Sequence, residues 1–212
     1  MRIYFVRHGE SDANTLNVFS NRAPGHALTA SGRKQVALLA DELTREPDGN
    51  SFLAIYSSPL QRAIESAQIL SEKLAIPYVV SAALTEYDVG IYEGRSDEEG
   101  WRKYGEVLRE WLLDGNWDAR MEGGESFNDM RSRFLPFMEW LKSQHGHRDG
   151  SVILMGHGGT YGCMLPLVLE NVDFAFAAKN MIENTTYILA DLKGGKFVCS
   201  TWGGIQVDRA DG

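Results

Sequence analysis

The sequence predicts an α/β fold, a three-layer α/β/α sandwich with a mostly parallel central sheet. Short apolar runs alternate with helical patterns over the first 80 residues, and this alternation is typical of a parallel sheet covered by helices. The chain has 212 residues, of which 43% are hydrophobic and 24% are charged. Such a chain is long enough for one sizeable core. We therefore expect a single domain over residues 1–212, with residues 91–125 as an insertion.

The first half of the chain supplies the predicted alternation. Apolar runs rich in β-branched and aromatic residues predict strands at residues 1–6, 52–56 and 77–80. Apolar residues at helical spacing predict helices at about residues 30–44 and 59–74. Ser58 suits the N-cap of the second helix and Pro59 its first position. Residues 11–28 are polar and contain Pro24-Gly25, which favours a loop or a broken helix over the end of the first strand.

Residues 91–125 differ from their surroundings, because tryptophan and tyrosine are interleaved with arginine and lysine. The segment is too short for a core of its own, so we expect a partly helical insertion that lies over the site as a lid. Tyr92, Trp101 and Tyr104 are candidates to line the mouth of a pocket. We therefore expect the insertion to govern the choice of substrate.

The C-terminal part extends the same pattern. A long helix is expected from Ser126, because Ser126 and Asp129 have the spacing of a capping box. A strand at residues 151–155 and a helix to about residue 169 follow. Two further apolar runs, joined through Gly194-Gly195, predict a closing pair of strands at residues 185–192 and 197–202.

Composition excludes several classes of protein. Twenty-one basic and twenty-nine acidic residues give a formal net charge of −8 at pH 7, which repels nucleic acid and anionic membrane surfaces. No apolar stretch is long enough to span a bilayer and the N-terminus lacks the pattern of a signal peptide, so we expect a cytoplasmic protein. Cys163 and Cys199 indicate neither a disulfide scaffold nor a cysteine zinc site. The oligomeric state stays open, a homodimer being one option.

Four predicted strand ends carry side chains that could hold an anion: Arg7 with His8, Arg62, Glu86 and His157. Ligands of open α/β sheets bind outside the carboxyl ends of the strands. Each residue also has an ordinary explanation as a solvated surface charge or a core histidine, but these explanations would have to coincide four times. Two guanidinium groups and a histidine match a phosphoryl group. Gly158 and Gly159, at the start of a helix, add backbone N–H groups that favour an anion.

A set of short motifs occurs in a defined order over residues 1–160. They are Arg7-His8-Gly9-Glu10-Ser11 with Asn14, Leu28-Thr29-Ala30-Ser31-Gly32-Arg33-Lys34-Gln35, Ser57-Ser58-Pro59-Leu60-Gln61-Arg62-Ala63, Leu84-Thr85-Glu86 with Gly90 and Glu93-Gly94, Gly123-Gly124-Glu125-Ser126 and Gly156-His157-Gly158-Gly159. Arg-His-Gly alone is a weak signal, but the ordered set resembles the histidine phosphatase superfamily, the phosphoglycerate mutase-like family. The resemblance implies a phosphoglycerate mutase-like fold.

The resemblance also implies roles for the matching residues. His8 resembles the nucleophile that takes the phosphoryl group, and Glu86 resembles the proton donor to the leaving oxygen. Arg7, Arg62 and His157 resemble the pocket that holds the group. A neutral imidazole can attack phosphorus in line and give a phosphohistidine, while the cations stabilise charge on the phosphoryl oxygens. This scheme needs neither a metal ion nor a cofactor.

Further contacts to the phosphate are expected from Asn14 and Gly158. Many relatives read Gly-x-x-Asp-x-x-Leu-Thr before the first helix, whereas residues 22–29 here read Arg-Ala-Pro-Gly-His-Ala-Leu-Thr. This departure leaves open whether Asn21 and Arg22 bind a second anionic group or only face solvent. We treat both as candidate substrate-binding residues.

The resulting prediction is a metal-independent phosphatase that hydrolyses a small phosphorylated metabolite, a phosphomonoester, through a phosphohistidine. One alternative is phosphoglycerate mutase-type phosphoryl transfer. Mutases of the family resemble a longer chain with extra arginines in the insertion. Here Trp101-Arg102-Lys103-Tyr104 resembles that feature only weakly, because it lacks paired arginines. Another is a catalytically silent phosphate-binding protein. A dinucleotide site is disfavoured because the third glycine of GxGxxG would fall at Tyr161. A metal hydrolase is disfavoured because close ligand spacing is missing.

Overall fold

A seven-stranded sheet is the centre of the computed structural model, which describes residues 1–22, 24–45 and 51–207. The strand order is β3-β2-β4-β1-β5-β6-β7. The strands are β1 (Arg2–Arg7), β2 (Phe52–Ser57), β3 (Tyr78–Val80), β4 (Ser151–Gly156), β5 (Tyr187–Lys193), β6 (Lys196–Trp202) and β7 (Ile205–Gln206). The four strands from β3 to β1 run parallel, and β5, β6 and β7 each run antiparallel to the preceding neighbour. The predicted mostly parallel sheet is confirmed.

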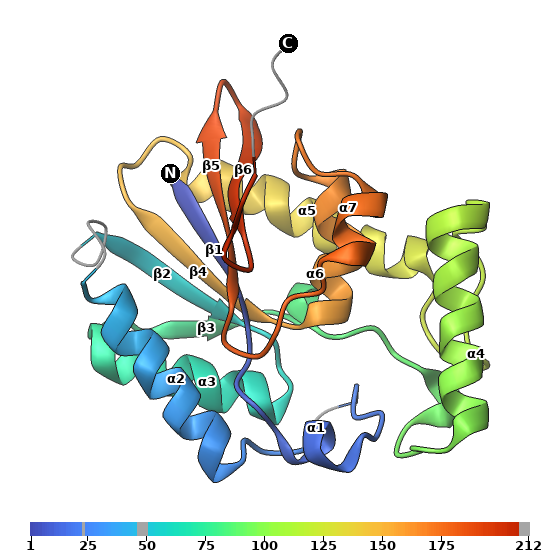
Figure 1. Ribbon diagram of the computed structural model, residues 1–212. Helices are drawn as coiled ribbons and strands as arrows, with labels where there is room; N and C mark the ends of the chain where they lie inside the picture. The colour runs from blue at the N-terminus through green and yellow to red at the C-terminus, as the bar shows by residue number, and fades with distance from the viewer. Residues whose placement is uncertain (23, 46–50, 208–212) are drawn as a thin grey trace.

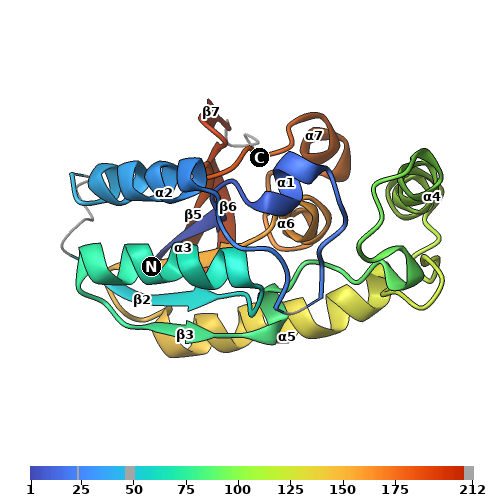
Figure 2. The ribbon, with the colours of Figure 1, turned by 90° about the horizontal axis from the view of Figure 1, so that it is seen from below.

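Helices cover both faces of this sheet, as Figures 1 and 2 show. The pair α2 (Ala30–Leu43) and α3 (Gln61–Leu74) lies on one face, and α5 (Phe127–His145) with α6 (Gly158–Met164) lies on the other. The remaining helical segments are α1 (Asp12–Leu16), α4 (Glu98–Arg109), α7 (Phe174–Lys179), a π-helical turn at Glu110–Asp114 and 3₁₀ turns at Ala82–Leu84, Gly90–Tyr92 and Leu165–Leu167. Helix α4 stands apart from the sheet at the side of the molecule (Figure 1).

Alternation of side chains along β1 explains why the sheet separates two cores. Ile3 and Phe5 belong to the larger apolar cluster, which includes residues of α5 and α6. Tyr4 and Val6 belong to the other cluster, formed with residues of α2 and α3. All four side chains are buried. A strand buried on both faces reads as a continuous apolar run, which is the pattern of residues 3–6.

The parallel register brings three strand ends to one edge of the sheet. Arg7 of β1 pairs with Gly156 of β4, and Ser57 of β2 pairs with Met155 of β4. The residues that follow these strands therefore leave the sheet side by side. This edge is the carboxyl end at which open α/β sheets bind ligands.

Helix boundaries differ from the prediction in one informative place. Helix α3 begins at Gln61, two residues later than predicted. Ser58 does not cap the helix; its Oγ accepts the Leu60 N–H at 3.3 Å and contacts His157 at 2.7 Å. By contrast, the predicted capping box of α5 is present, with the side chains of Ser126 and Asp129 each accepting the other residue's backbone N–H.

Residues 91–125 contain α4 and the π-helical turn, in agreement with the partly helical character expected from their sequence. Trp111 of the π-helical turn is buried and packs edge-on against Tyr87 and Phe127. Strand β7 and helix α7 were not predicted. Within the described residues, no helix combines the length and apolarity needed to cross a membrane.

Candidate active site

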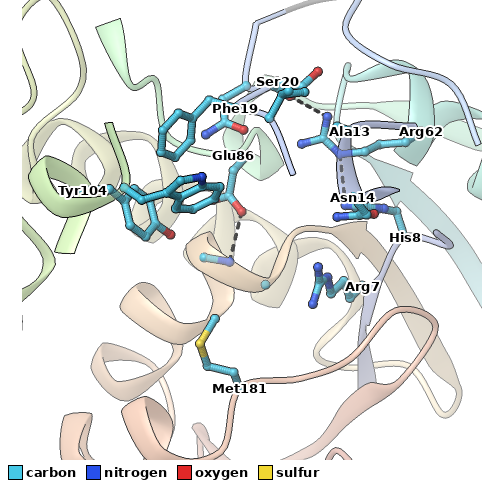
Figure 3. A pocket seen from close by; sticks show the side chains of 15 residues that line it. Arg7, His8, Ala13, Asn14, Phe19, Ser20, Arg62, Glu86, Tyr104 and Met181 are labelled. Carbon is cyan, nitrogen blue, oxygen red and sulfur yellow. Dashed lines mark hydrogen bonds between the residues drawn. The ribbon is translucent and has the colours of Figure 1, made fainter. Parts of the chain in front are cut away.

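A pocket opens at the carboxyl edge of the sheet, and Figure 3 shows side chains converging on it from several elements. His8 and the arginines stand on one side, while Phe19 and Tyr104 face them from the other. The pocket wall contains most of the predicted site residues: Arg7, His8, Asn14, Asn21, Arg62, Glu86 and Gly158. His157 lies immediately beside the pocket, and Arg22 lies outside its wall.

His8 is held as a neutral imidazole in one orientation. Its Nδ1 lies 2.7 Å from the carbonyl oxygen of Gly9, and a carbonyl can only accept, so Nδ1 carries the proton. The lone pair therefore resides on Nε2, which accepts a hydrogen bond from Arg62 Nε at 3.0 Å. Burial, reinforced by the charges of Arg62 and Arg7, holds the pKa of His8 well below its ordinary value of 6.5. Such an imidazole is a nucleophile that needs no base to deprotonate it.

Arg62 and Arg7 supply positive charge next to this nitrogen. Arg62 is 4% exposed, and its Nη1 donates to the carbonyl of Ser20 at 2.5 Å. Burial lowers the pKa of Arg62 to about 10, so the guanidinium stays charged at neutral pH. Arg7 Nη1 donates to the carbonyl of Ile182 at 2.7 Å, while Arg7 Nε is buried with no hydrogen-bond partner among the described residues. A buried donor without a partner is costly, and an anion bound there would satisfy it.

His157 is fully buried beside His8, with the two ring centroids 5.1 Å apart. Its Nε2 lies 2.7 Å from Ser58 Oγ, and its Nδ1 is a buried atom without a partner in the described part of the chain. Burial, together with the charge of Arg62, holds the pKa of His157 well below its ordinary value. When Ser58 donates its hydroxyl proton to Nε2, the ring proton resides on Nδ1, which is then a second donor with no acceptor.

Glu86 approaches the pocket from the loop after the 3₁₀ turn at Ala82–Leu84. Its Oε2 accepts the Gly159 N–H at 3.0 Å, and its Oε1 lies 2.9 Å from Thr160 Oγ1. A Cβ at position 159 would lie 2.8 Å from Glu86 Oε1 and 2.7 Å from Tyr87 Cε1. The absence of a side chain at Gly159 is therefore what allows the carboxyl group to approach the start of α6.

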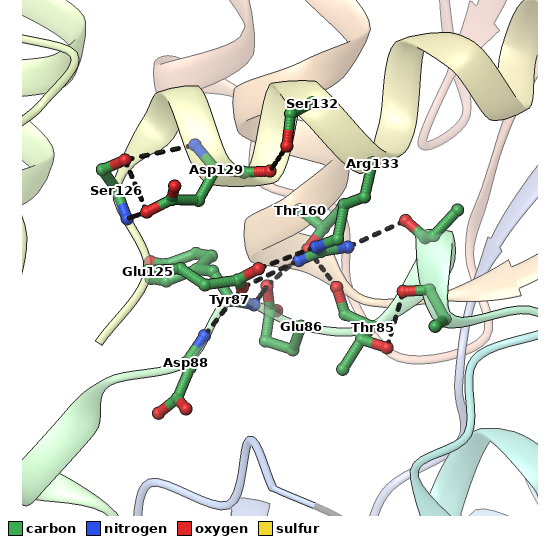
Figure 4. A network of polar contacts seen from close by, with 12 residues as sticks. Thr85, Glu86, Tyr87, Asp88, Glu125, Ser126, Asp129, Ser132, Arg133 and Thr160 are labelled. Atoms are coloured by element: carbon green, nitrogen blue, oxygen red, sulfur yellow. Dashed lines mark hydrogen bonds and ion pairs between the residues drawn. The ribbon is translucent and has the colours of Figure 1, made fainter. Parts of the chain in front are cut away.

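A network of polar contacts holds the loop that carries Glu86, as Figure 4 shows. Arg133 of α5 donates to both carboxylate oxygens of Glu125 at 2.9 and 3.0 Å and to the carbonyl of Ala83 at 2.8 Å. Glu125 in turn accepts the Asp88 N–H at 3.1 Å. The loop is thus anchored on both sides of Glu86, so the carboxyl group has a defined position.

The predicted polar contacts at the mouth have different surroundings. Asn14 completes the capping box of α1, in which Ser11 is the N-cap residue: Asn14 Oδ1 accepts the backbone N–H of Ser11 at 3.0 Å. Asn21 lines the pocket and donates from Nδ2 to the carbonyl of Tyr87 at 2.8 Å. Arg22 is exposed and points to Asp88, with Nε 3.0 Å from both carboxylate oxygens. The structure therefore brings Asn14 and Asn21 to the pocket and directs Arg22 to an ion pair.

Apolar side chains form the outer wall of the pocket: Ala13, Val18, Phe19, Trp101, Tyr104 and Met181. Trp101 and Tyr104 were predicted as candidates for the pocket mouth and lie in its wall; Tyr92, the third candidate, does not. Sequence reasoning missed Phe19 and Met181, as well as the contacts of Ser58 and Thr160. The Ser57-Ser58-Pro59 motif was visible, but nothing in its pattern pointed to His157.

The described residues offer no built metal site. In residues 1–22, 24–45 and 51–207, no group of three or more His, Cys, Asp and Glu side chains is arranged to hold a metal ion. The cationic groups at the pocket are arginines, which bind phosphoryl oxygens directly.

Similarity to known proteins covers almost the whole chain. A model of the histidine phosphatase superfamily (branch 1) matches residues 3–204. Phosphoserine phosphatase 1 of Hydrogenobacter thermophilus is 30% identical over 157 residues, which are 74% of this chain and 71% of that protein. A probable phosphoglycerate mutase of Salmonella choleraesuis is 28% identical over 210 residues, 95% of this chain and 90% of that protein. A solved mycobacterial glucosyl-3-phosphoglycerate phosphatase matches the fold with a TM-score of 0.80 at 21% identity, covering 96% of this chain and 99% of that one.

Proposed function

This chain belongs to branch 1 of the histidine phosphatase superfamily, and we propose that it is a metal-independent phosphatase that hydrolyses a small phosphomonoester through phospho-His8. The observation that carries the proposal is the state of His8. Its ring is neutral, Nδ1 is tied to a carbonyl, and the Nε2 lone pair is directed toward the charged end of the pocket. A nucleophile prepared in this way beside two arginines suits an anionic phosphorus centre.

In the first step, His8 Nε2 attacks phosphorus and the bond between phosphorus and the ester oxygen breaks. Glu86 gives its proton to the departing alkoxide, and the product is phospho-His8 with the free alcohol. Arg7 and Arg62 neutralise charge on the phosphoryl oxygens throughout. Arg7 Nε is the donor that is buried without a partner, so a phosphoryl oxygen would satisfy it.

In the second step, a water molecule attacks the phosphorus of phospho-His8. Glu86 accepts the proton of this water, the phosphorus–nitrogen bond breaks, and its electron pair returns to Nε2. Thr160 Oγ1 lies 2.9 Å from both the Thr85 carbonyl and Glu86 Oε1. Since the carbonyl can only accept, a Thr160 hydroxyl that donates to it leaves its oxygen lone pairs able to accept a hydrogen bond from a protonated Glu86 carboxyl group. This site therefore suits both protonation states that the cycle requires.

Relatives with phosphatase names and relatives with mutase names both match the chain, so the proposal of hydrolysis rests on the pocket. A mutase must hold a substrate with two anionic groups. Among the described residues of the pocket wall, the positively charged side chains are Arg7 and Arg62, which both lie beside His8. A second phosphoryl group would meet no counter-charge among the described residues of this wall, and this asymmetry supports transfer to water.

The test is a metal-free assay followed by trapping of the intermediate. We expect phosphate release from an aryl phosphate in excess chelator, and acid-labile, base-stable phosphate on the quenched protein. Both signals should vanish in His8→Ala and persist in His147→Ala, a matched control because His147 is exposed. Activity that needs an added divalent metal would overturn the mechanism. Phosphate binding without any turnover would support the silent alternative instead.

A second assay separates hydrolysis from phosphoryl transfer. The protein is supplied with 3-phosphoglycerate and a trace of bisphosphoglycerate, and isomerisation is compared with phosphate release. We expect phosphate release to be the faster reaction. Faster isomerisation would favour the mutase.

A further inference from the structure

We infer that the pocket selects phosphomonoesters of uncharged alcohols that carry an aromatic or comparable apolar group, and that Trp101 donates a hydrogen bond to a neutral oxygen of that alcohol. The inference rests on the proposed phosphatase function and deepens it by naming the substrate class. Three observations carry it: the distribution of charge in the pocket, a wall of three aromatic rings in contact, and a buried indole N–H without a partner among the described residues.

Charge in the pocket is confined to the end that holds the phosphoryl group. The charged or imidazole residues of the described wall are Arg7, His8, Arg62 and Glu86, and the others are neutral. Three cations on the segments that carry the outer wall are paired with carboxylates: Arg22 with Asp88, Arg95 with Asp97 and Glu99, and Lys103 with Glu106. A carboxylate or second phosphoryl group on the alcohol would thus leave water without gaining a counter-ion, which is unfavourable.

Three aromatic rings form a continuous wall opposite His8. The Phe19 and Trp101 ring centroids are 4.2 Å apart, and Tyr104 lies 5.5 Å from each of them. Figure 3 shows Phe19 and Tyr104 facing the arginine side of the pocket. The rings are tilted against one another, with interplanar angles of 38°, 36° and 74°, and together they offer an apolar surface on which another ring or an alkyl chain can pack.

The backbone fixes this wall in place. The Phe19 N–H donates to the Arg95 carbonyl at 3.0 Å, and the Gly94 N–H donates to the Phe19 carbonyl at 2.9 Å. A Cβ at Gly100 would lie only 3.2 Å from Phe19 Cε2, so the Phe19 ring rests on the backbone of α4. The segment before α2 and the first turn of α4 therefore form one preorganised surface, which lowers the entropic cost of binding.

Trp101 contributes a polar group within the apolar wall. Its Nε1 is buried and has no hydrogen-bond partner in the described part of the chain, although the residue lines the pocket. An indole N–H can only donate, and a buried donor without an acceptor is unfavourable. A neutral ether, hydroxyl or carbonyl oxygen on the alcohol would satisfy this donor without bringing a charge.

The experiment compares three primary-alcohol phosphates in excess chelator: 3-phosphoglycerate, 3-phenylpropyl phosphate and 2-phenoxyethyl phosphate. Phenoxyethyl differs from phenylpropyl by an ether oxygen in place of a methylene, so the pair reports the hydrogen bond. We expect kcat/KM for 3-phenylpropyl phosphate to exceed that for 3-phosphoglycerate by at least about tenfold. The ratio of phenoxyethyl to phenylpropyl should fall about 3- to 10-fold in Trp101→Phe, which keeps a ring and loses the donor.

Trp140→Phe is the matched control, because Trp140 is an exposed residue of α5 outside the pocket wall. In Trp140→Phe, the kcat/KM ratio of 3-phenylpropyl phosphate to 3-phosphoglycerate and that of 2-phenoxyethyl to 3-phenylpropyl phosphate should equal those of the unaltered protein. Release of phosphate from all three esters with 3-phosphoglycerate equal or preferred would overturn the inference while leaving the proposed function intact. An unchanged phenoxyethyl-to-phenylpropyl ratio in Trp101→Phe would overturn the role of the indole donor. No release from any ester would overturn the phosphatase proposal itself.

Discussion

Arg62 Nε donates a 3.0 Å hydrogen bond to Nε2 of His8, the imidazole nitrogen that carries the lone pair. The contact joins the first residue after β1 to the first turn of α3, and it orients the lone pair without protonating it. Because Arg62 is buried and also bonded to the Ser20 carbonyl, its position is set by the fold.

The first prediction concerns the guanidinium of Arg62. In Arg62→Lys the charge stays but the fixed contact to His8 and the two-pronged donor geometry are lost. We expect kcat/KM for an aryl phosphate to fall by roughly 10²- to 10³-fold, measured by phosphate release. Arg102→Lys is the control, because Arg102 is exposed and pairs with Glu106 on the same helix. Equal activity of Arg62→Lys and the unaltered protein would contradict the assignment.

The second concerns stability and pH. The folded protein holds the pKa of both His8 and His157 well below 6.5, chiefly through burial, whereas in the unfolded chain each takes up a proton near 6.5. Above pH 6.5 both rings are neutral in the folded and in the unfolded chain, so their burial carries no penalty from protonation. Below pH 6.5 the unfolded chain binds these protons and the folded protein does not, so the free energy of unfolding falls. Each of the two histidines lowers the free energy of unfolding by up to about 1.4 kcal/mol for each pH unit below 6.5.

Urea unfolding at pH 7.5, 6.5 and 5.5 measures this dependence. The free energy of unfolding should decline between pH 6.5 and pH 5.5. The decline should be smaller in His8→Asn, in which the imidazole at position 8 is replaced by an amide that does not titrate. The control His147→Asn should retain the full decline, because His147 is exposed. Identical slopes for His8→Asn and the unaltered protein would show that His8 titrates normally in the fold.

The third concerns Ser58. Ser58→Ala removes the hydroxyl 2.7 Å from His157 Nε2, so the proton of the neutral ring is no longer directed to Nδ1. We expect kcat/KM to fall about tenfold, with restoration in Ser58→Thr. Nitrogen-15 NMR should show the Nδ1-protonated tautomer of His157 in the unaltered protein and its loss in Ser58→Ala. Ser57→Ala, which loses the hydrogen bond from Ser57 Oγ to the Ser58 carbonyl, should leave that tautomer unchanged.

The fourth compares two glycines of α6. A Cβ at Gly159 would lie within 3.0 Å of both carboxylate oxygens of Glu86, whereas a Cβ at Gly162 would meet no atom within 4 Å. Gly159→Ala should therefore displace Glu86 and lower kcat by about 10²-fold. Gly162→Ala should keep full activity and raise the free energy of unfolding by about 0.5–1 kcal/mol. Normal kcat in Gly159→Ala would show that Glu86 tolerates displacement.

Much of the fold was predictable because its signals are local. The apolar runs at 1–6, 52–56 and 151–155 and the capping residues of α5 depend on neighbouring side chains, and their strands and helix formed as predicted. Helix α3 was misplaced by two residues because Ser58 bonds a partner 99 residues away. Strand β7 was missed because two residues carry no periodicity.

The sequence by itself determined which chemical groups stand at the strand ends, since motif order and hydrophobic period are properties of the chain alone. Arg7, His8 and Arg62 could be singled out in this way. Only the tertiary structure decided which of them meet, which imidazole nitrogen holds the lone pair, and which side chains form the outer wall. Phe19 and Met181 come from distant segments, and no local pattern records a contact that forms only when the sheet assembles.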